Sequence, residues 1–305
     1  MTKRISFLCL AILACTGLIS PPVALAMGLG FALAFGNPFE SVSHRASKML
    51  LQWSVVGLGF GMNLPAVWSA GKTGFGFTLV SIWGTLLLGL LFGRLLRVES
   101  QTSTLVSVGT SVCGGSAIAA VGAVLEADAS AMSVSLITVF VLNAVALFIF
   151  PPLGHLLGMD QAHFGLWSAI AIHDTSSVVG AAAKYGEQAL DIATTVKLVR
   201  ALWIVPIALG IAIISRRGKK GVKIPWFIPA FLAAAAIHTL LPSGEAAFDV
   251  IKQAAKLGLT LTLFLIGAGL SRDALKKVGF RPLVQGVLLW IVISVSGLLA
   301  VELLL

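Results

Sequence analysis

Two ionisable side chains stand next to each other inside a long apolar stretch of this sequence. His173 and Asp174 follow Ala-Ile-Ala-Ile and precede Thr175, Ser176 and Ser177. Ionisable groups deep in a membrane span are costly and usually functional. We expect Asp174 to bind and release a proton or to coordinate Na⁺, assisted by His173, Thr175 and Ser176, since His titrates near neutral pH. In the alternative interpretation, Asp174 is a fixed partner of a buried cation and His173 is a satisfied core residue.

Two basic residues lie three positions apart in another apolar stretch, TTVKLVRALWIVP. This spacing places Lys197 and Arg200 on one helix face. Two buried cations against one buried Asp leave a net positive centre, and a planar guanidinium matches an oxyanion by paired hydrogen bonds. We therefore expect both residues to balance the charge of a bound anion. Alternatively, Lys197 extends to the outer interface. Asn143 and Pro206 are interpreted as helix packing and a kink.

A third segment combines glycines with small polar residues at the centre of an apolar run, STLVSVGTSVCGGSAIAAVGAV. Glycines destabilise a continuous helix. Unwound backbone in a membrane exposes amide groups to a ligand, and the start of a helix favours an anion. We favour a helix break here over an interface between two intact helices. The expected anion ligands are Gly109, Thr110, Ser111, Cys113, Gly114, Gly115 and Ser116.

The composition predicts the elements that hold these residues. Of the 305 residues, 58% are hydrophobic and 11% charged, and the mean hydropathy is +1.01, which excludes a water-soluble fold. We predict an all-α polytopic membrane protein, one domain over 1–305 with halves 1–158 and 159–305. The apolar runs predict eleven spans, at 5–20, 23–37, 46–64, 74–95, 102–124, 131–153, 164–183, 192–214, 225–241, 254–270 and 282–304.

The basic residues predict an orientation. With the N-terminus inside, fifteen Lys and Arg fall in inner segments, and only Lys72, Lys184, Lys252 and Lys256 fall in outer ones. This predicts a cytoplasmic N-terminus and an external C-terminus. Residues 1–26 also resemble a secretory signal, and we favour a retained first span. The net charge of +9 accompanies no nucleic-acid motif, and the cysteines have no metal or disulfide spacing, so we expect no cofactor, metal or nucleic acid.

The chain also shows weak internal symmetry. Residues 51–67 and 256–275 are each apolar, end in a Gly-rich turn and then have a short polar exit. An odd number of crossings separates the two segments, so they run in opposite directions, as an inverted repeat requires. Shared composition alone explains the likeness equally well.

Five segments together resemble a sulfate exporter family of bacterial inner-membrane proteins. They are GTSVCGGSAIAA (109–120), AIHDTSSVV (171–179), KLVRALWIVP (197–206), KIPWFIPAF (223–231) and GAGLSRDALKKVGFRPL (267–283). The resemblance covers nearly the whole chain. It implies a fold similar to cation–proton antiporters and bile-acid symporters, in which two inverted repeats cross at discontinuous helices. Many members carry His-Glu followed by Val-Ala-Gln, where this chain has His173 and Asp174 followed by Thr-Ser-Ser.

We therefore predict a secondary transporter of a small inorganic or sulfonate-like anion, sulfate or a relative, in a bacterial inner membrane. Alternating access would be coupled to H⁺ or Na⁺ through Asp174. No GxxxxGK loop indicates an ATP-driven pump. The alternative is a cation–proton antiporter that uses Asp174, in which Arg200→Ala leaves exchange intact. A membrane enzyme with Ser116 or Cys113 as nucleophile and a His173–Asp174 base is disfavoured, so we predict no enzymatic activity.

Overall fold

The computed structural model describes residues 2–62, 64–215, 226–241, 244–270 and 279–304. The described residues form helices and connecting turns, without a strand. The prediction of an all-α fold is confirmed. The helices are α1 (Thr2–Ala14), α2 (Pro21–Phe35), α3 (Glu40–Gly59), α4 (Leu64–Leu95), α5 (Ser100–Ser111), α6 (Gly115–Leu125), α7 (Ala129–Leu156), α8 (Gln161–Ala171), α9 (Thr175–Tyr185), α10 (Glu187–Leu202), α11 (Ile204–Ser215), α12 (Phe227–Leu240), α13 (Glu245–Gly269) and α15 (Phe280–Leu304).

The span prediction is confirmed only in part. Five helical segments are long and apolar enough to cross a membrane: Thr78–Leu95, Ser130–Leu156, Glu187–Ile211, Glu245–Gly269 and Phe280–Leu303. Three shorter apolar helices are α2, α6 and α12. Two predicted spans, 102–124 and 164–183, are each divided into two short helices, so neither counts as one long helix.

Several details of the predicted topology need correction or fall outside the described residues. The loop expected before residue 74 is helical, because α4 already begins at Leu64. Eight of the fifteen inner basic residues lie in 216–223 and 271–278, outside the described residues. The interruption between α10 and α11, at Trp203, matches the kink expected from Pro206, whose ring crowds the carbonyl four residues earlier.

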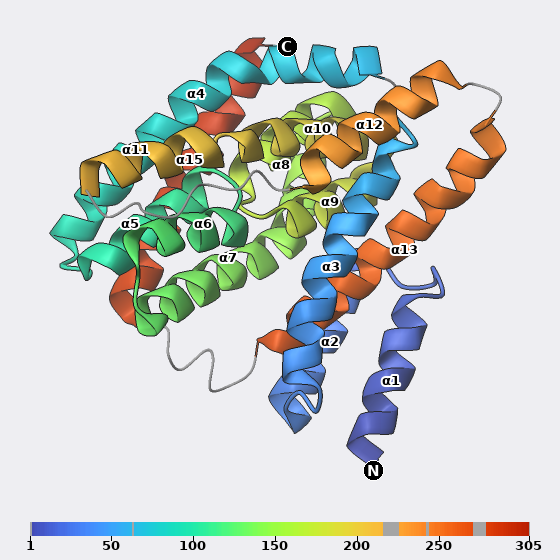
Figure 1. The fold of residues 1–305 in the computed structure, drawn as a ribbon, viewed down its shortest axis with the longest axis horizontal. Coiled ribbons are helices and arrows are strands. Elements are labelled where there is room, and N and C mark those ends of the chain that lie inside the picture. The colour runs from blue at the N-terminus through green and yellow to red at the C-terminus, as the bar shows by residue number, and fades with distance from the viewer. Residues whose placement is uncertain (1, 63, 216–225, 242–243, 271–278, 305) are drawn as a thin grey trace.

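The helices form two groups (Figure 1). The crossing bundle consists of α4 to α11 and α15, and the flanking group consists of α1, α2, α3, α12 and α13. α3 and α13 pack antiparallel, because Gly57 lies against Ala255 while Ser54 lies against Gly258. The opposite directions expected for residues 51–67 and 256–275 are thus present in the described parts of both segments. The inverted repeat itself remains a prediction.

The two groups meet on small residues of α9. A β-carbon placed on Gly180 would lie 2.7 Å from a methyl group of Leu263 in α13 and 3.4 Å from Pro21 in α2. At one edge of this contact, Lys256 of α13 donates a 2.7 Å hydrogen bond to Glu187 at the start of α10. At α9 the groups therefore touch through an apolar face with an ion pair beside it. A second contact joins α4 to α12, where the Leu64 amide donates a 2.8 Å hydrogen bond to the Thr239 hydroxyl.

Acidic residues between the helices act as N-caps. Asp128 caps α7 by accepting a hydrogen bond from the amide of Ala131. Asp160 caps α8 by accepting one from the amide of His163. The amide of His163, and then its ring nitrogen 2.8 Å away, hold the pKa of Asp160 below its ordinary value. Asp128 thus fixes the start of a long helix.

Candidate functional site

The predicted break in the glycine-rich segment is present. α5 ends at Ser111 and α6 begins at Gly115, with Gly114 at φ +65° and ψ −126° between them. An L-residue rarely adopts this backbone conformation, so glycine permits the change of direction. Gly109, Thr110 and Ser111 are buried in the last turn of α5, Cys113 is buried in the break, and Gly115 and Ser116 open α6. The alternative of two intact helices meeting at small residues is wrong.

A second break lies at the His173–Asp174 pair. α8 ends at Ala171 and α9 begins at Thr175, so the pair does not lie within a continuous helix as the sequence suggested. Asp174 caps α9: its carboxylate accepts hydrogen bonds from the amide of Ser177 at 2.9 Å, from the Ser177 hydroxyl at 2.8 Å and from the Ser176 hydroxyl. A capping carboxylate, rather than glycine, stabilises this interruption.

The two breaks cross each other. A β-carbon placed on Gly114 would lie 2.9 Å from Cβ and 3.3 Å from Cα of Asp174, so the two unwound backbones are in direct contact. Four helix ends meet at this crossing: the C-terminal ends of α5 and α8 and the N-terminal ends of α6 and α9. The sequence predicted the first break. The structure shows a second break, at His173 and Asp174, packed against the first.

Lys197 and Arg200 hold the C-terminal ends of α5 and α8. Arg200 Nη1 donates to the carbonyls of Ala169 at 3.0 Å and Ile170 at 2.6 Å, and its Nη2 donates to the Ser111 carbonyl at 2.6 Å. Lys197 Nζ donates to the carbonyls of Ala169 at 3.2 Å and Ile172 at 2.7 Å. Both side chains are fully buried, so an extension of Lys197 to the interface is wrong. Cations are favoured where the helix dipole is negative.

Asp174 is not an ion-pair partner of these cations. Within the described residues, ion pairs join Asp160 to His163 and Glu187 to Lys252 and Lys256, and none joins Asp174 to Lys197 or Arg200. The interpretation of Asp174 as a fixed ion-pair partner is therefore contradicted. The four helix ends carry partial charges of about half a unit, two of each sign, which cancel to first order. Two cations and one carboxylate then leave a formal charge of about +1 at the crossing.

Asn143 of α7, interpreted from the sequence as a helix-packing residue, lies at the second break. Its Oδ1 accepts a 2.9 Å hydrogen bond from the backbone amide of His173, so α7 braces the second break. Asn143 is 2% exposed and His173 is fully buried. Neither Asn143 Nδ2 nor either ring nitrogen of His173 has a hydrogen-bond partner among the described residues. A lone amide within an otherwise apolar run was the available signal.

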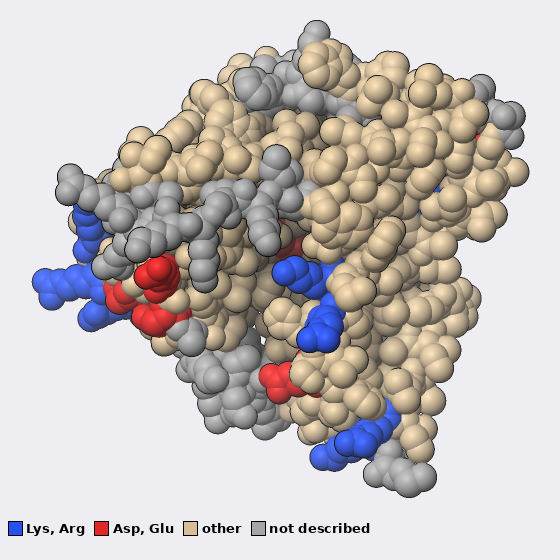
Figure 2. Space-filling view, viewed as in Figure 1, with Lys and Arg blue, Asp and Glu red and all other residues tan. Residues whose placement is uncertain are grey.

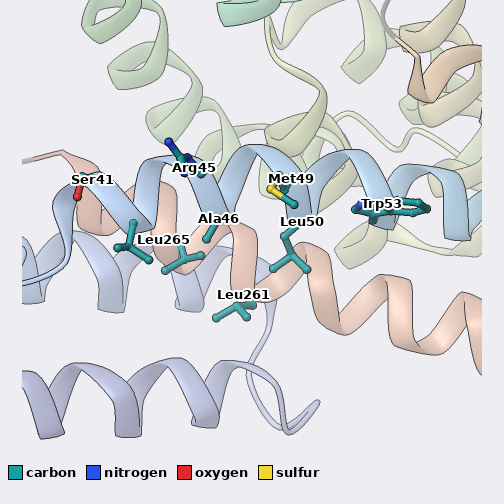
Figure 3. Close-up of a pocket in the computed structure, with 9 residues that line it drawn as sticks. Ser41, Arg45, Ala46, Met49, Leu50, Trp53, Leu261 and Leu265 are labelled. Atoms are coloured by element: carbon teal, nitrogen blue, oxygen red, sulfur yellow. The ribbon is translucent and has the colours of Figure 1, made fainter.

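A surface groove lies apart from the crossing. It has a volume of about 630 Å³ and runs between α3 and α13, where Met49, Leu50, Trp53 and Leu261 form an apolar lining with Arg45 toward one end (Figure 3). Lys and Arg atoms also lie over α3 on the face in Figure 2, where α3 contributes Arg45 and Lys48.

No group of three or more His, Cys, Asp or Glu side chains in the described part of the chain could hold a metal ion.

Comparison with known proteins identifies the family. A family model described as "Conserved hypothetical protein 698" matches residues 6–286. A "UPF0324 membrane protein" of Bacteroides thetaiotaomicron is 53% identical over 282 residues, which cover 92% of this chain and 86% of the relative. The chain belongs to the UPF0324 membrane protein family.

Other members of the UPF0324 family match over almost their full length. The relative in Porphyromonas gingivalis is 51% identical over 93% of this chain and 87% of its own. The relative in Geobacter sulfurreducens is 49% identical over 99% of this chain and 97% of its own. No solved structure matches the chain. The relatives' names describe membrane proteins, in agreement with the apolar helices, and the resemblance to sulfate exporters remains a prediction.

Proposed function

We propose that this UPF0324 protein is a secondary transporter of a small oxyanion, sulfate or a related sulfur oxyanion or sulfonate. The observation that carries the proposal is the crossing of two broken helices beside two buried cations. Unwound backbone inside a membrane protein is tolerated where it is buried or lines a cavity, and it places helix ends next to a ligand. The formal positive charge at the crossing favours an anion over a cation.

Each predicted site residue has a role in this proposal. The amides and hydroxyls of 109–116 bind the anion at the start of α6, which has no side-chain cap. Lys197 and Arg200 supply the positive charge that balances the anion. They do so from the C-terminal ends of α5 and α8, to whose carbonyls they are bonded. Asp174, with His173, Thr175 and Ser176 around it, couples anion movement to H⁺ or Na⁺. Transport proceeds by alternating access, in which the crossing bundle and the flanking group move relative to each other.

The membrane topology belongs to the same proposal. We count each interrupted pair, α5–α6 and α8–α9, as one crossing. Together with the five long spans and with α1, α2, α3 and α12, they make the eleven crossings of this proposal. The N-terminus is cytoplasmic and the C-terminus external, as the fifteen inner against four outer basic residues indicate. We place the protein in the bacterial inner membrane, with the lipid bilayer, the anion and the coupling ion as its partners. Neither a cofactor nor enzymatic chemistry is part of the mechanism.

The test is uptake of labelled sulfate into proteoliposomes with and without imposed H⁺ and Na⁺ gradients. Asp174→Asn keeps an oxygen for capping α9, so the variant should fold while losing gradient-driven uptake. Asp160→Asn, which changes a capping acid outside the crossing, is the matched control and should transport normally. Gradient-independent uptake in the unmodified protein, or normal uptake by Asp174→Asn, would remove Asp174 from the coupling role.

A cation–proton antiporter is the second candidate, because Asp174 lies at the crossing without an ion-pair partner among the described residues. The same proteoliposomes distinguish the two functions. If no oxyanion enters but Na⁺ exchanges for H⁺ in the unmodified protein and not in Asp174→Asn, the antiporter is correct. In that case Lys197 and Arg200 serve only to hold the helix ends.

A further inference from the structure

We infer that Asn143 is an anion ligand, donating two hydrogen bonds to an oxyanion bound at the helix crossing. The inference rests on the proposed function and assigns a residue of α7 to its binding site. It starts from an imbalance between buried donors and acceptors around the two breaks.

The orientation of the Asn143 amide is fixed by its one hydrogen bond. The backbone N–H of His173 can only donate, so the Asn143 oxygen must face it, as the 2.9 Å distance shows. The Nδ2 group then points away from that bond. It carries two N–H donors, is buried and has no acceptor among the described residues. Buried donors without partners are rare in folded proteins, which indicates that a ligand or a bound solvent molecule completes them.

Asn143 lies beside both breaks. One turn before it on α7, Phe140 packs against the first residue of α6: a β-carbon on Gly115 would lie 3.2 Å from its ring. Asn143 itself bonds to His173, the residue before Asp174, whose Cα and Cβ lie against Gly114. α7 therefore passes the uncapped start of α6 at Phe140 and the α8–α9 break at Asn143.

Other donors at the crossing also have no partner. Arg200 Nε is buried without an acceptor, although the two terminal nitrogens of that guanidinium are bonded to carbonyls. The start of α6 adds backbone N–H groups without a side-chain cap. Two of the nearby acceptors are already used, Asn143 Oδ1 by His173 and the Asp174 carboxylate by Ser176 and Ser177. The buried Thr110 hydroxyl has no partner among the described residues and can itself donate to an anion.

This donor excess specifies the ligand. A group that offers only acceptor oxygens, such as sulfate or a sulfonate, can accept from donors of this kind, and hydrogen bonds to a charged group are the stronger kind. Na⁺ needs oxygen ligands, which Asn143 Nδ2 and Arg200 Nε do not offer. Asn143 thus contributes to selecting an anion over a cation, through donors that the glycine-rich segment does not supply.

Two variants separate a ligand from a positioning residue. Asn143→Asp keeps an oxygen for the His173 amide and removes both donors, whereas Asn143→Leu removes the oxygen and the donors together. Gln285→Leu is the control, because Gln285 is a fully buried amide whose Nε2 donates to Gly89, Ser103 and Ser107, away from the breaks. The measurements are sulfate affinity, from the concentration dependence of the thermal unfolding midpoint of the purified protein, and the KM of sulfate uptake in proteoliposomes.

We expect sulfate affinity to fall by about ten-fold or more in both Asn143 variants, and by less than about two-fold in Gln285→Leu. Affinity retained in Asn143→Asp but lost in Asn143→Leu would show that Asn143 only positions His173, and would overturn the inference while leaving the transport proposal intact. An equal loss in Gln285→Leu would also overturn it. If the unmodified protein neither binds nor transports sulfate, thiosulfate or methanesulfonate, the proposed function fails and the ligand assignment with it.

Discussion

Replacing Gly114 by alanine should destabilise the protein more than replacing another glycine that also has a positive φ. The φ of +65° costs an L-residue about 1–2 kcal/mol. The added methyl group would also lie 2.9 Å from Asp174 Cβ, and relieving such overpacking costs about 1–3 kcal/mol. The sum is about 2–5 kcal/mol, which for a chain of this size lowers the unfolding midpoint by about 4–10 °C.

Two other glycines isolate these contributions. Gly158, at φ +68°, has nothing within 4 Å of its β-carbon position, so Gly158→Ala carries the backbone strain alone and should lose about 2–4 °C. Gly210 lies within α11 with open space around it, so Gly210→Ala should be neutral or stabilise by up to about 1 kcal/mol. The assay is thermal unfolding of the purified protein in one detergent. If Gly114→Ala loses no more than Gly158→Ala, the two breaks do not touch as described.

Four further predictions concern charged residues. Arg200→Lys should lower stability by about 3 kcal/mol in thermal unfolding, because one amine cannot serve the carbonyls at the ends of both α5 and α8; an unchanged midpoint would contradict this role. Asp174→Ala should cost about 1 kcal/mol more than Asp174→Asn in the same assay, because only Asn can cap α9. Cross-linking cysteines placed at Glu187 and Lys256 should stop sulfate uptake without lowering sulfate affinity, and continued uptake would exclude movement between the two groups there. The hydrogen bonds that lower the pKa of Asp160 stabilise the fold above about pH 4, and this stabilisation is lost as the pH falls through the folded-state pKa; Asp160→Asn should show a smaller loss of stability between pH 5 and pH 3.

The sequence predicted the break in α5–α6 because its cause is local. Three glycines within a short apolar run disfavour a continuous helix whatever surrounds them. The second break lacks a glycine, and its signal is the Asp-Thr-Ser-Ser pattern, in which Asp174 caps a new helix. In an apolar context the same four residues also suit a functional cluster within one helix, so the pattern alone did not decide between them.

The partners of Lys197 and Arg200 could not be predicted from residue types. Both cations bond to backbone carbonyls, of Ala169, Ile170 and Ile172 among others, and a carbonyl gives no signal in the side-chain sequence. The sequence correctly indicated buried cations and a nearby Asp, but it suggested an ion pair where the structure has helix ends. Asn143 was assigned to helix packing for a related reason, because its partner is also a backbone group that becomes available only when α8 ends.

The small residues of α9 give the two helix groups a plane along which they can slide. Val178, Val179, Gly180, Ala181 and Ala182 are buried, and within the described residues no hydrogen bond joins α9 to α2 or α13. A displacement along such a face exchanges one set of van der Waals contacts for another of similar energy. No hydrogen bond of α9 to α2 or α13 has to break, so the directional contacts that change in such a displacement lie elsewhere, at Lys256–Glu187 and at Leu64–Thr239. A larger side chain in place of Gly180 would press against Leu263 of α13 and hold the two groups in one relative position.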